Sequence, residues 1–141
     1  DKKEMEKEAE EFYQASKKYK PTYYWLDVEE KTMNDMNAGV EAFRAKLESL
    51  GAKNIGIYIG TYFMEEHSIS TDKFTALWIP TYGHDDGYYN AAPSTDDEYD
   101  LHQYTSQGQL NGFTHYLDLN QIAPTQDQEK IYRKLFTVEK N

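Results

Sequence analysis

The chain has 141 residues, of which 38% are hydrophobic, and this length supports one domain with a packed core but not two. The formal net charge of -10 argues against nucleic acid as a partner, because a grip on phosphates needs clustered Lys and Arg. No apolar run approaches the ~20 residues of a membrane span. Cysteine is absent, which excludes disulfides and thiolate metal sites. We therefore expect a single domain over residues 1–141.

Helices and strands alternate in the first half of the chain. Apolar side chains recur at helical spacing in Lys2–Tyr19, which predicts an amphipathic surface helix that ends before a proline. The aromatic and β-branched segment Tyr23–Glu29 predicts a strand. A second helix is predicted over Asn34–Leu50, with Gly51 as its C-terminal cap. Ile55–Gly60 follows as a strand whose isoleucines share one face, and the small residues of the other face leave room inside.

The second half of the chain carries weaker helical signals and a long loop. Glu65–Phe74 indicates a short helix, and Thr75–Tyr82 indicates a third strand. His84–Asp100 is rich in Asp, Gly, Asn, Ser and Pro and predicts a long loop, a feature that is often functional in compact domains. Two final strands are predicted over Leu101–Thr105 and Phe113–Leu119. Their connector is too short for a helical crossover, so they must pair as an antiparallel hairpin.

The order of these elements predicts the fold class. A last short helix is predicted over Gln126–Val138. Alternating helices and buried strands are typical of an α/β protein, in which helices cover a parallel sheet. Five strands are predicted where a closed barrel has about eight, and the chain opens on a helix, so we expect a partial barrel without its upstream strands. The two unpaired edges are expected to recruit other chains into a homo-oligomer, or to be covered by the first helix.

Asp27 and Glu29 are the polar residues that carry most information about function. They lie two apart on a predicted strand, so both side chains point to one face together with Trp25. The opposite face is apolar, which favours a half-buried acidic pair over a solvated strand face. Two like charges in proximity raise the proton affinity of one of them, which provides an acid beside a stabilising charge. Hydrolysis of a glycosidic bond needs that division of roles.

Five ordered segments widen the pattern around the acidic pair. In order and spacing they resemble the strand motifs of the lysozymes of glycoside hydrolase family 25. The resemblance covers most of the chain, from about Tyr24 to Ile122. The segments are Tyr24–Glu29, Gly56–Gly60, Leu77–Ile79, Gln103–Thr105 and Leu117–Asn120.

The resemblance implies a fold and an activity. The fold is a TIM-like (β/α)5(β)3 barrel, here a partial barrel that starts at the helix before the D-x-E strand, with the active site at the carboxyl ends of the strands. The activity is cleavage of the β-1,4 bond between N-acetylmuramic acid and N-acetylglucosamine in peptidoglycan, with no metal or organic cofactor. Such an enzyme acts outside the cell or at the cell wall, as a secreted autolysin or a phage endolysin.

The resemblance also implies roles for single residues. Glu29 matches the general acid of the family, and Asp27 matches its companion acid, which orients the acetamido group of the substrate or stabilises positive charge. The family is usually discussed as retaining, and the sequence does not choose between a covalent route and participation of the substrate's own acetamido group. A further Asp that the family carries on its first barrel strand has no counterpart in Asp1–Tyr19, so the isolated chain is expected to be inactive although its parent is an enzyme.

Six further residues are candidates for substrate binding, each beside a structural alternative. Asp118 matches the acid on the last barrel strand, although an inward acid bonded to a tyrosine explains it almost as well. The aromatic rings either stack on sugars or fill the core. The buried amide is slightly more consistent with a structural hydrogen bond, to a neighbour such as Asp118, than with a bond to substrate. The six are Asp118, Tyr58, Tyr62, Trp78, Tyr82 and Gln103, and of the rings Tyr62 and Tyr82 are stronger candidates than Trp78.

Other polar patterns predict no site. The four histidines lack metal-binding spacing, and the acidic loop His84–Asp100 does not match a calcium-binding loop, so no metal is expected. Two other functions stay open at this point. One is a fragment that binds cell-wall glycan without cutting it, and the other is an unrelated barrel glycosidase that acts on chitin or cellulose.

Overall fold

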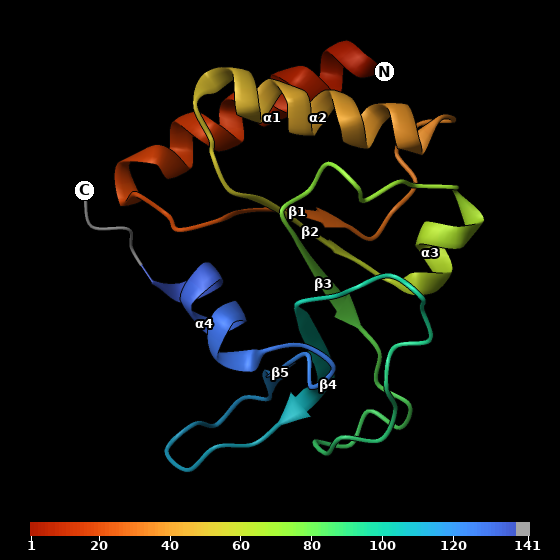
Figure 1. Cartoon of the computed structure of the whole chain (residues 1–141), viewed down its shortest axis with the longest axis vertical. Coiled ribbons are helices and arrows are strands. Elements are labelled where there is room, and N and C mark those ends of the chain that lie inside the picture. The colour runs from red at the N-terminus through yellow and green to blue at the C-terminus, as the bar shows by residue number, and fades with distance from the viewer. Residues whose placement is uncertain (138–141) are drawn as a thin grey trace.

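A computed structural model describes residues 1–137 and contains one mixed sheet with helices packed around it (Figure 1). The strand order is β1-β2-β3-β4-β5; neighbours from β1 to β4 are parallel, and β5 is antiparallel to β4. The strands are β1 Tyr24–Val28, β2 Ile55–Ile59, β3 Ala76–Pro80, β4 Leu101–Gly108 and β5 Leu117–Ile122. The helices are α1 Lys2–Ser16, η1 Lys17–Tyr19, α2 Met36–Leu50, α3 Thr61–Glu66 and α4 Gln128–Phe136.

Helices α1 and α2 lie side by side over one face of the sheet (Figure 1). Helix α2 begins where the Asp35 carboxylate accepts a hydrogen bond from the Ala38 amide at 3.0 Å. It ends at Gly51, whose φ of 117° is a left-handed conformation that suits glycine. The predicted C-terminal cap is therefore confirmed, and the cap turns the chain directly toward β2.

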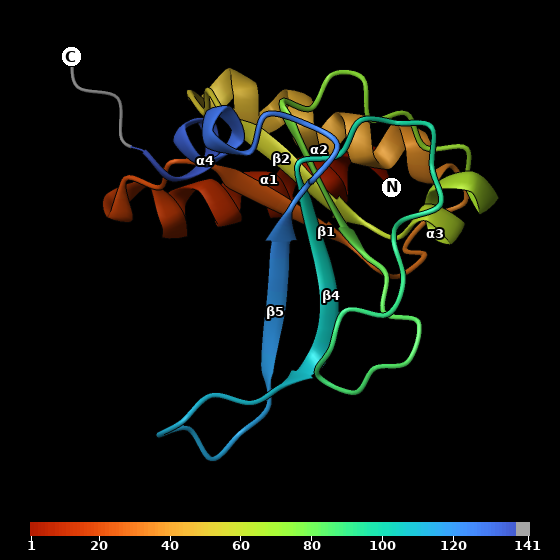
Figure 2. The same cartoon turned by 60° about the horizontal axis from the view of Figure 1, so that its bottom comes forward.

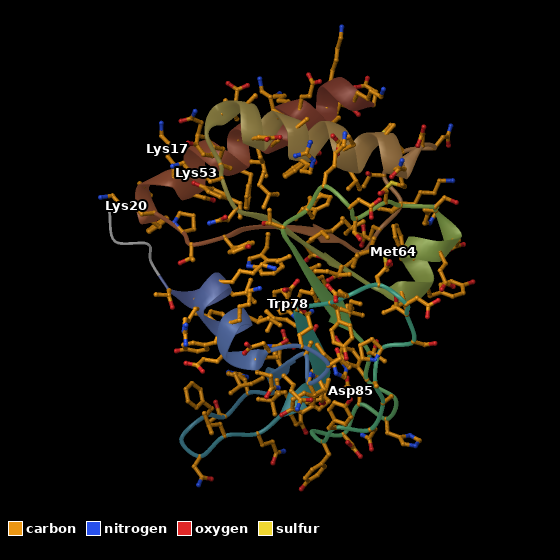
Figure 3. All side chains as sticks on the ribbon, viewed as in Figure 1. Lys17, Lys20, Lys53, Met64, Trp78 and Asp85 are labelled. Atoms are coloured by element: carbon orange, nitrogen blue, oxygen red, sulfur yellow. The ribbon has the colours of Figure 1, made fainter. Side chains whose placement is uncertain are left out.

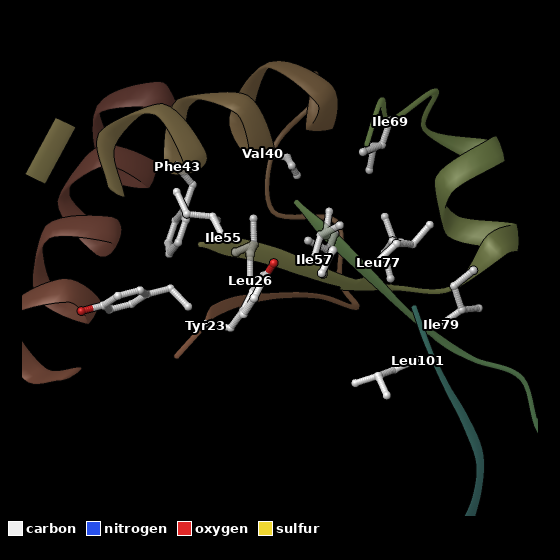
Figure 4. Packing of buried hydrophobic residues seen from close by; sticks show 14 of the residues in the cluster. Tyr23, Leu26, Val40, Phe43, Ile55, Ile57, Ile69, Leu77, Ile79 and Leu101 are labelled. Atoms are coloured by element: carbon white, nitrogen blue, oxygen red, sulfur yellow. The ribbon is translucent and has the colours of Figure 1, made fainter. Parts of the chain in front are cut away.

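The core lies between α2 and the strands beneath it (Figure 4). The register pairs Leu26 of β1 with Ile57 of β2, so their side chains share the face turned to the helices. Val40 and Leu47 of α2 pack in the same cluster and are fully buried, as is Ile57. Apolar side chains that recur at every second residue of the strands and at helical spacing in α2 pack against each other in this layer. Removal of these side chains from water is the main stabilising contribution to the fold.

The sheet is not closed, and β1 and β5 form its edges. An α/β fold with an open, mostly parallel sheet was predicted from the order of the elements, and this prediction is confirmed. Recruitment of other chains by the two edges stays a prediction. Among residues 1–137 no helix is long and apolar enough to cross a membrane.

Two predicted elements lie elsewhere along the chain. The antiparallel hairpin is confirmed, but β4 continues to Gly108, and β5 begins at Leu117 rather than at Phe113. The residues between them form an exposed tip that projects beyond the sheet (Figure 2), where no strand of residues 1–137 pairs with them. The short helix α3 follows β2 directly and replaces the helix predicted over Glu65–Phe74. Val138, the predicted end of the last helix, lies outside the described residues.

Candidate active site

The candidate site lies on the face of the sheet opposite α1 and α2. Strand register places Asp27 beside Tyr58 and Tyr58 beside Trp78, and it pairs Pro80 with Gln103 at the end of β3. Because parallel strands align their carboxyl ends, these side chains come from three successive strand ends and from the start of the next strand. We call this surface the site face and define it by Trp25, Asp27, Tyr58, Trp78 and Gln103.

The acidic pair stands at the carboxyl end of β1. Asp27 lies in the strand, Glu29 follows its last residue, and both side chains are exposed. A hydrogen bond between the two side chains raises the pKa of Glu29 above its usual value, and partial burial and the charges of Asp27 and Asp118 raise it further. Glu29 therefore holds its proton to higher pH than a free glutamic acid does.

The exposure of this pair corrects the expectation that Asp27 and Glu29 are half-buried. β1 is an edge strand, and among residues 1–137 no helix packs on the site face beside it. The apolar side chains of β1 are buried under α1 and α2, as the alternation predicts, but the opposite side of the strand end faces solvent. Proximity of the two carboxyl groups, more than burial, is therefore the cause of the raised Glu29 pKa.

Asp118 comes from β5, the strand at the other edge of the sheet. Its negative charge nevertheless raises the pKa of both Glu29 and Tyr82, so the curved sheet brings its carboxylate within electrostatic reach of β1. Within residues 1–137 no hydrogen bond joins Asp118 to a tyrosine, which was the structural alternative for this residue. The three predicted acids thus gather at one end of the sheet.

Tyr58 and Gln103 form a hydrogen-bonded pair beneath the acids. The Tyr58 hydroxyl donates to Oε1 of Gln103 at 2.5 Å, and the Gln103 side chain is buried, at 4% exposure. Burial raises the pKa of Tyr58, and its contact with Tyr82 and the charges of Glu29 and Asp27 act in the same direction. The buried amide is therefore satisfied from within the protein, as a structural role predicts, but its partner is Tyr58 rather than Asp118.

Aromatic rings line the rest of the site face. Tyr23 stacks on Trp25 with ring centroids 5.5 Å apart, and Trp25 meets Trp78 edge to face at 5.5 Å. The rings of Trp78 and Tyr58 also meet edge to face, with centroids 4.8 Å apart. The Trp25 ring fills the space above Gly56, where an added Cβ would lie 2.4 Å from the ring. The expectation that the small residues of β2 leave room inside is therefore wrong at Gly56, where a neighbouring side chain takes the space, whereas the space beside Gly60 is open.

Tyr82 and Tyr62 have different positions although sequence reasoning grouped them. Tyr82 follows β3, is partly buried, and contacts the hydroxyl of Tyr58. Tyr62 lies on α3 and is 78% exposed, and no aromatic or hydrogen-bonded contact within residues 1–137 joins it to the acids. The structure thus brings together Tyr58, Trp78, Tyr82, Gln103 and the three acids, but not Tyr62.

Sequence reasoning missed Asn120 and Asp85 as contributors to the site. Asn120 accepts a hydrogen bond from Nε1 of Trp78 at 2.8 Å, and its place two residues after Asp118 on one strand was the available signal. Asp85 accepts from the Thr105 hydroxyl at 2.6 Å and ties the loop after β3 to the end of β4. Figure 3 shows Asp85 beyond Trp78 at this end of the molecule. The local sequence pattern around either residue could not predict this hydrogen bond, because the two residues are 20 positions apart.

The chemistry of this surface depends on carboxyl groups. Within residues 1–137 no group of three or more His, Cys, Asp or Glu side chains is arranged to hold a metal ion. A glutamic acid whose pKa is raised by a second carboxyl group, at the carboxyl end of a strand in a mostly parallel sheet, is the arrangement found in barrel glycoside hydrolases. The fold and the site together define that class of protein.

Comparison with known families agrees with this class. The model of the glycosyl hydrolases family 25 matches residues 1–113 of the chain. This match covers well over half of the chain, so the chain belongs to family 25 of the glycosyl hydrolases. The resemblance identified from the strand motifs is thereby confirmed. No protein with a curated description matches the chain significantly.

Solved structures extend the comparison. GHIP, a family 25 glycosyl hydrolase and virulence factor of Streptococcus pneumoniae that participates in host cell invasion, is 62% identical with a TM-score of 0.94. The match covers 96% of this chain and 60% of GHIP, so the chain spans less than two thirds of that relative. The catalytic domain of the endolysin ply40 from bacteriophage P40 of Listeria monocytogenes is 26% identical, with a TM-score of 0.79 and coverage of 96% and 66%. The endolysin CTP1L, at 24% identity and a TM-score of 0.74, shares the fold over 95% of this chain and 45% of its own.

Proposed function

We propose that the chain is the greater part of a catalytic domain that hydrolyses peptidoglycan at the β-1,4 bond between N-acetylmuramic acid and N-acetylglucosamine. The observation that carries the proposal is the Glu29 carboxyl group, whose pKa is raised by its hydrogen bond to Asp27, at the strand end of a family 25 fold. Raising the pKa of a glutamic acid prepares it to donate a proton near neutral pH. Glu29 is accordingly the general acid of the proposal.

The proposed reaction uses the two carboxyl groups in turn. Glu29 donates its proton to the glycosidic oxygen as the bond from that oxygen to C1 of the muramic acid unit breaks, and the leaving sugar departs as an alcohol. Asp27 supplies negative charge that stabilises the developing positive charge at C1 or orients the acetamido group beside it. Glu29, now a carboxylate, then takes a proton from the water that adds to C1. The proton on Glu29 is restored, and one water is consumed for each bond cut.

The contact between the two acids favours retention of configuration. An inverting pair keeps its carboxyl groups roughly 6.5–9.5 Å apart, because the attacking water stands between them. Asp27 and Glu29 interact directly enough for Asp27 to raise the pKa of Glu29, which favours a separation shorter than that. A retaining route, through Asp27 or through the substrate's own acetamido group, is therefore part of the proposal.

Substrate contacts and setting complete the proposal. Asp118 and Tyr82 adjoin the acids and contact the sugar nearest the cleaved bond. Trp78, Tyr58 and Gln103 act chiefly as the floor that holds them, and Tyr62 contacts a more distant part of the substrate from α3. Action at bacterial cell walls, outside the producing cell or from a phage, follows from this substrate and agrees with the endolysins among the related structures.

The test compares two single substitutions. Glu29→Gln, made in the full-length parent protein, keeps the shape of the side chain but loses the acidic proton, so we expect cell-wall clearing to fall by about 100- to 10,000-fold while the fold is unchanged. The matched control is Glu30→Gln, which changes the adjacent exposed acid and should clear walls at the unaltered rate. Wall clearing by the Glu29→Gln variant at the rate of the unaltered parent protein would contradict the assignment.

A non-catalytic wall-binding fragment is the second candidate, because both acids are exposed on an edge strand. Binding to insoluble walls, measured together with release of reducing sugar, distinguishes the two. Binding without release in the unaltered chain supports the fragment, and release that disappears in the Glu29→Gln variant supports the enzyme. Chitin and cellulose, used as further substrates, report whether the glycan is peptidoglycan.

A further inference from the structure

We propose that a second sugar-binding pocket lies between the loop after β3 and the β4–β5 hairpin, and that it takes a sugar unit of the same glycan strand. This inference rests on the proposed function. The cavity has a volume of about 400 Å³, and we call it the hairpin pocket. Its lining residues are Asp85, Asp86, Gly87, Tyr88, Gln107, Gln109, Tyr116 and Leu119.

The walls of the hairpin pocket combine aromatic rings and amides. Tyr88 from the loop after β3 and Tyr116 from the hairpin both line it and are 75% and 60% exposed, so their rings are open to a ligand. Tyrosine rings pack against the C–H faces of sugars, while the amides of Gln107 and Gln109 donate to and accept from hydroxyl and acetamido groups. The two tyrosine rings and the two amides together suit the binding of a neutral amino sugar.

The pocket is formed before any ligand binds. The Asp85 carboxylate accepts from the Thr105 hydroxyl at 2.6 Å, from the Ser106 amide at 2.7 Å and from the Ser106 hydroxyl. The Gly87 amide donates to the Thr105 hydroxyl at 3.0 Å. Gly87 has a φ of +92°, and an added Cβ would lie 3.0 Å from the carbonyl oxygen of Gln107. The loop is thus fixed against β4, and a fixed site binds without the entropic cost of ordering its walls.

The carboxylates of this loop are directed to the protein itself. Asp85 is occupied by Thr105 and Ser106, and Oδ1 of Asp86 accepts from the Tyr88 amide at 3.1 Å and from the Asn90 side chain at 2.8 Å. Hydrogen bonds from Ser106 and Thr105 lower the pKa of Asp85, so this tether is ionised over the ordinary pH range. A neutral saccharide suits the remaining rings and amides better than the charged stem peptide of the wall does.

The hairpin pocket adjoins the acidic site. Tyr82 follows β3 at the start of the loop that carries Asp85, and the charges of both Asp118 and Asp85 raise the pKa of Tyr82. Leu119, which lines the pocket, follows Asp118 on β5, so the two side chains belong to opposite faces of the same strand. We therefore infer that a glycan strand cut beside Glu29 reaches the pocket across the loop between Tyr82 and Asp85.

Binding is tested on the full chain with a tetramer of β-1,4-linked N-acetylglucosamine, followed by two-dimensional amide NMR spectra. We expect the backbone amides of Gly87, Gln107 and Gln109 to shift on titration. Loss of one stacked ring in Tyr88→Ala or Tyr116→Ala should weaken affinity about two- to tenfold.

The control uses a residue away from the hairpin pocket. Tyr19→Ala removes a ring of similar exposure, 74%, and should leave affinity unchanged. Tyr19 belongs to the turn bounded by Lys17 and Lys20, at the opposite end of the molecule from Asp85 (Figure 3).

The outcomes separate this inference from the proposed function. Unchanged affinity in a folded Tyr88→Ala, Tyr116→Ala double variant refutes the hairpin pocket, whatever the activity of the chain. Binding that the double variant loses supports the pocket even if the unaltered chain clears no walls. Shifts of the pocket amides with a synthetic stem peptide, but not with the tetramer, refute the saccharide assignment.

Discussion

Replacement of Tyr58 by phenylalanine tests how the floor of the site is held together. The substitution removes the hydroxyl that donates to Oε1 of Gln103 at 2.5 Å, and Gln103 is almost fully buried. A buried acceptor left without its donor costs about 1–3 kcal/mol, so we expect Tyr58→Phe to lower the free energy of unfolding by that amount. Because the ring itself is kept, its packing against Trp78 is retained.

Urea unfolding followed by far-ultraviolet circular dichroism measures this loss. Tyr62→Phe is the control, since its exposed hydroxyl has no buried partner, and it should change the free energy of unfolding by less than about 0.5 kcal/mol. Adding Gln103→Leu to Tyr58→Phe removes both partners, so the double variant should lose less than the sum of the single variants. Strict additivity, or equal stability of Tyr58→Phe and Tyr62→Phe, would refute a structural hydrogen bond.

Three further outcomes are expected. Asp27→Asn removes the contact and the charge that keep the proton on Glu29, so the Glu29 pKa measured by carbon NMR should fall, and the alkaline limit of wall clearing should move to lower pH. Asp100→Ala removes a buried carboxylate that accepts from the Leu77 amide at 2.9 Å and pairs with Lys134 at 2.8 Å. Chemical unfolding should show that the free energy of unfolding falls by about 2–3 kcal/mol in this variant and by about 1 kcal/mol in Asp100→Asn. Light scattering should detect oligomers paired through β1 or β5, and a monomer at all concentrations would contradict edge pairing.

Features that depend on local periodicity could be read from the sequence. Alternation in β1 correctly separated Leu26, which packs under α2, from Trp25 and Asp27 on the site face. The glycine after α2 was correctly taken as its cap, because a left-handed residue at that position depends on the last helical turn alone. The antiparallel pairing of β4 and β5 followed from the length of their connector.

Features that depend on distant parts of the chain could not be read. Exposure of Asp27 and Glu29 is set by what covers the end of an edge strand, and alternation within β1 carries no such information. Phe113 has the composition of a strand residue, but strand formation needs a partner, and the projecting tip has none among the described residues. The bond from Thr105 to Asp85 joins two segments that only the folded sheet brings together.

The edge-to-face contact of Trp25 and Trp78 has a spectroscopic consequence. These are the two tryptophans of the chain, their rings are 5.5 Å apart, and both lie on the site face. Indoles this close couple their electronic transitions, and the helices contribute no indole signal. A sugar that settles over either ring changes the emission of both, so the unlabelled protein carries an optical reporter of the surface on which the acids stand.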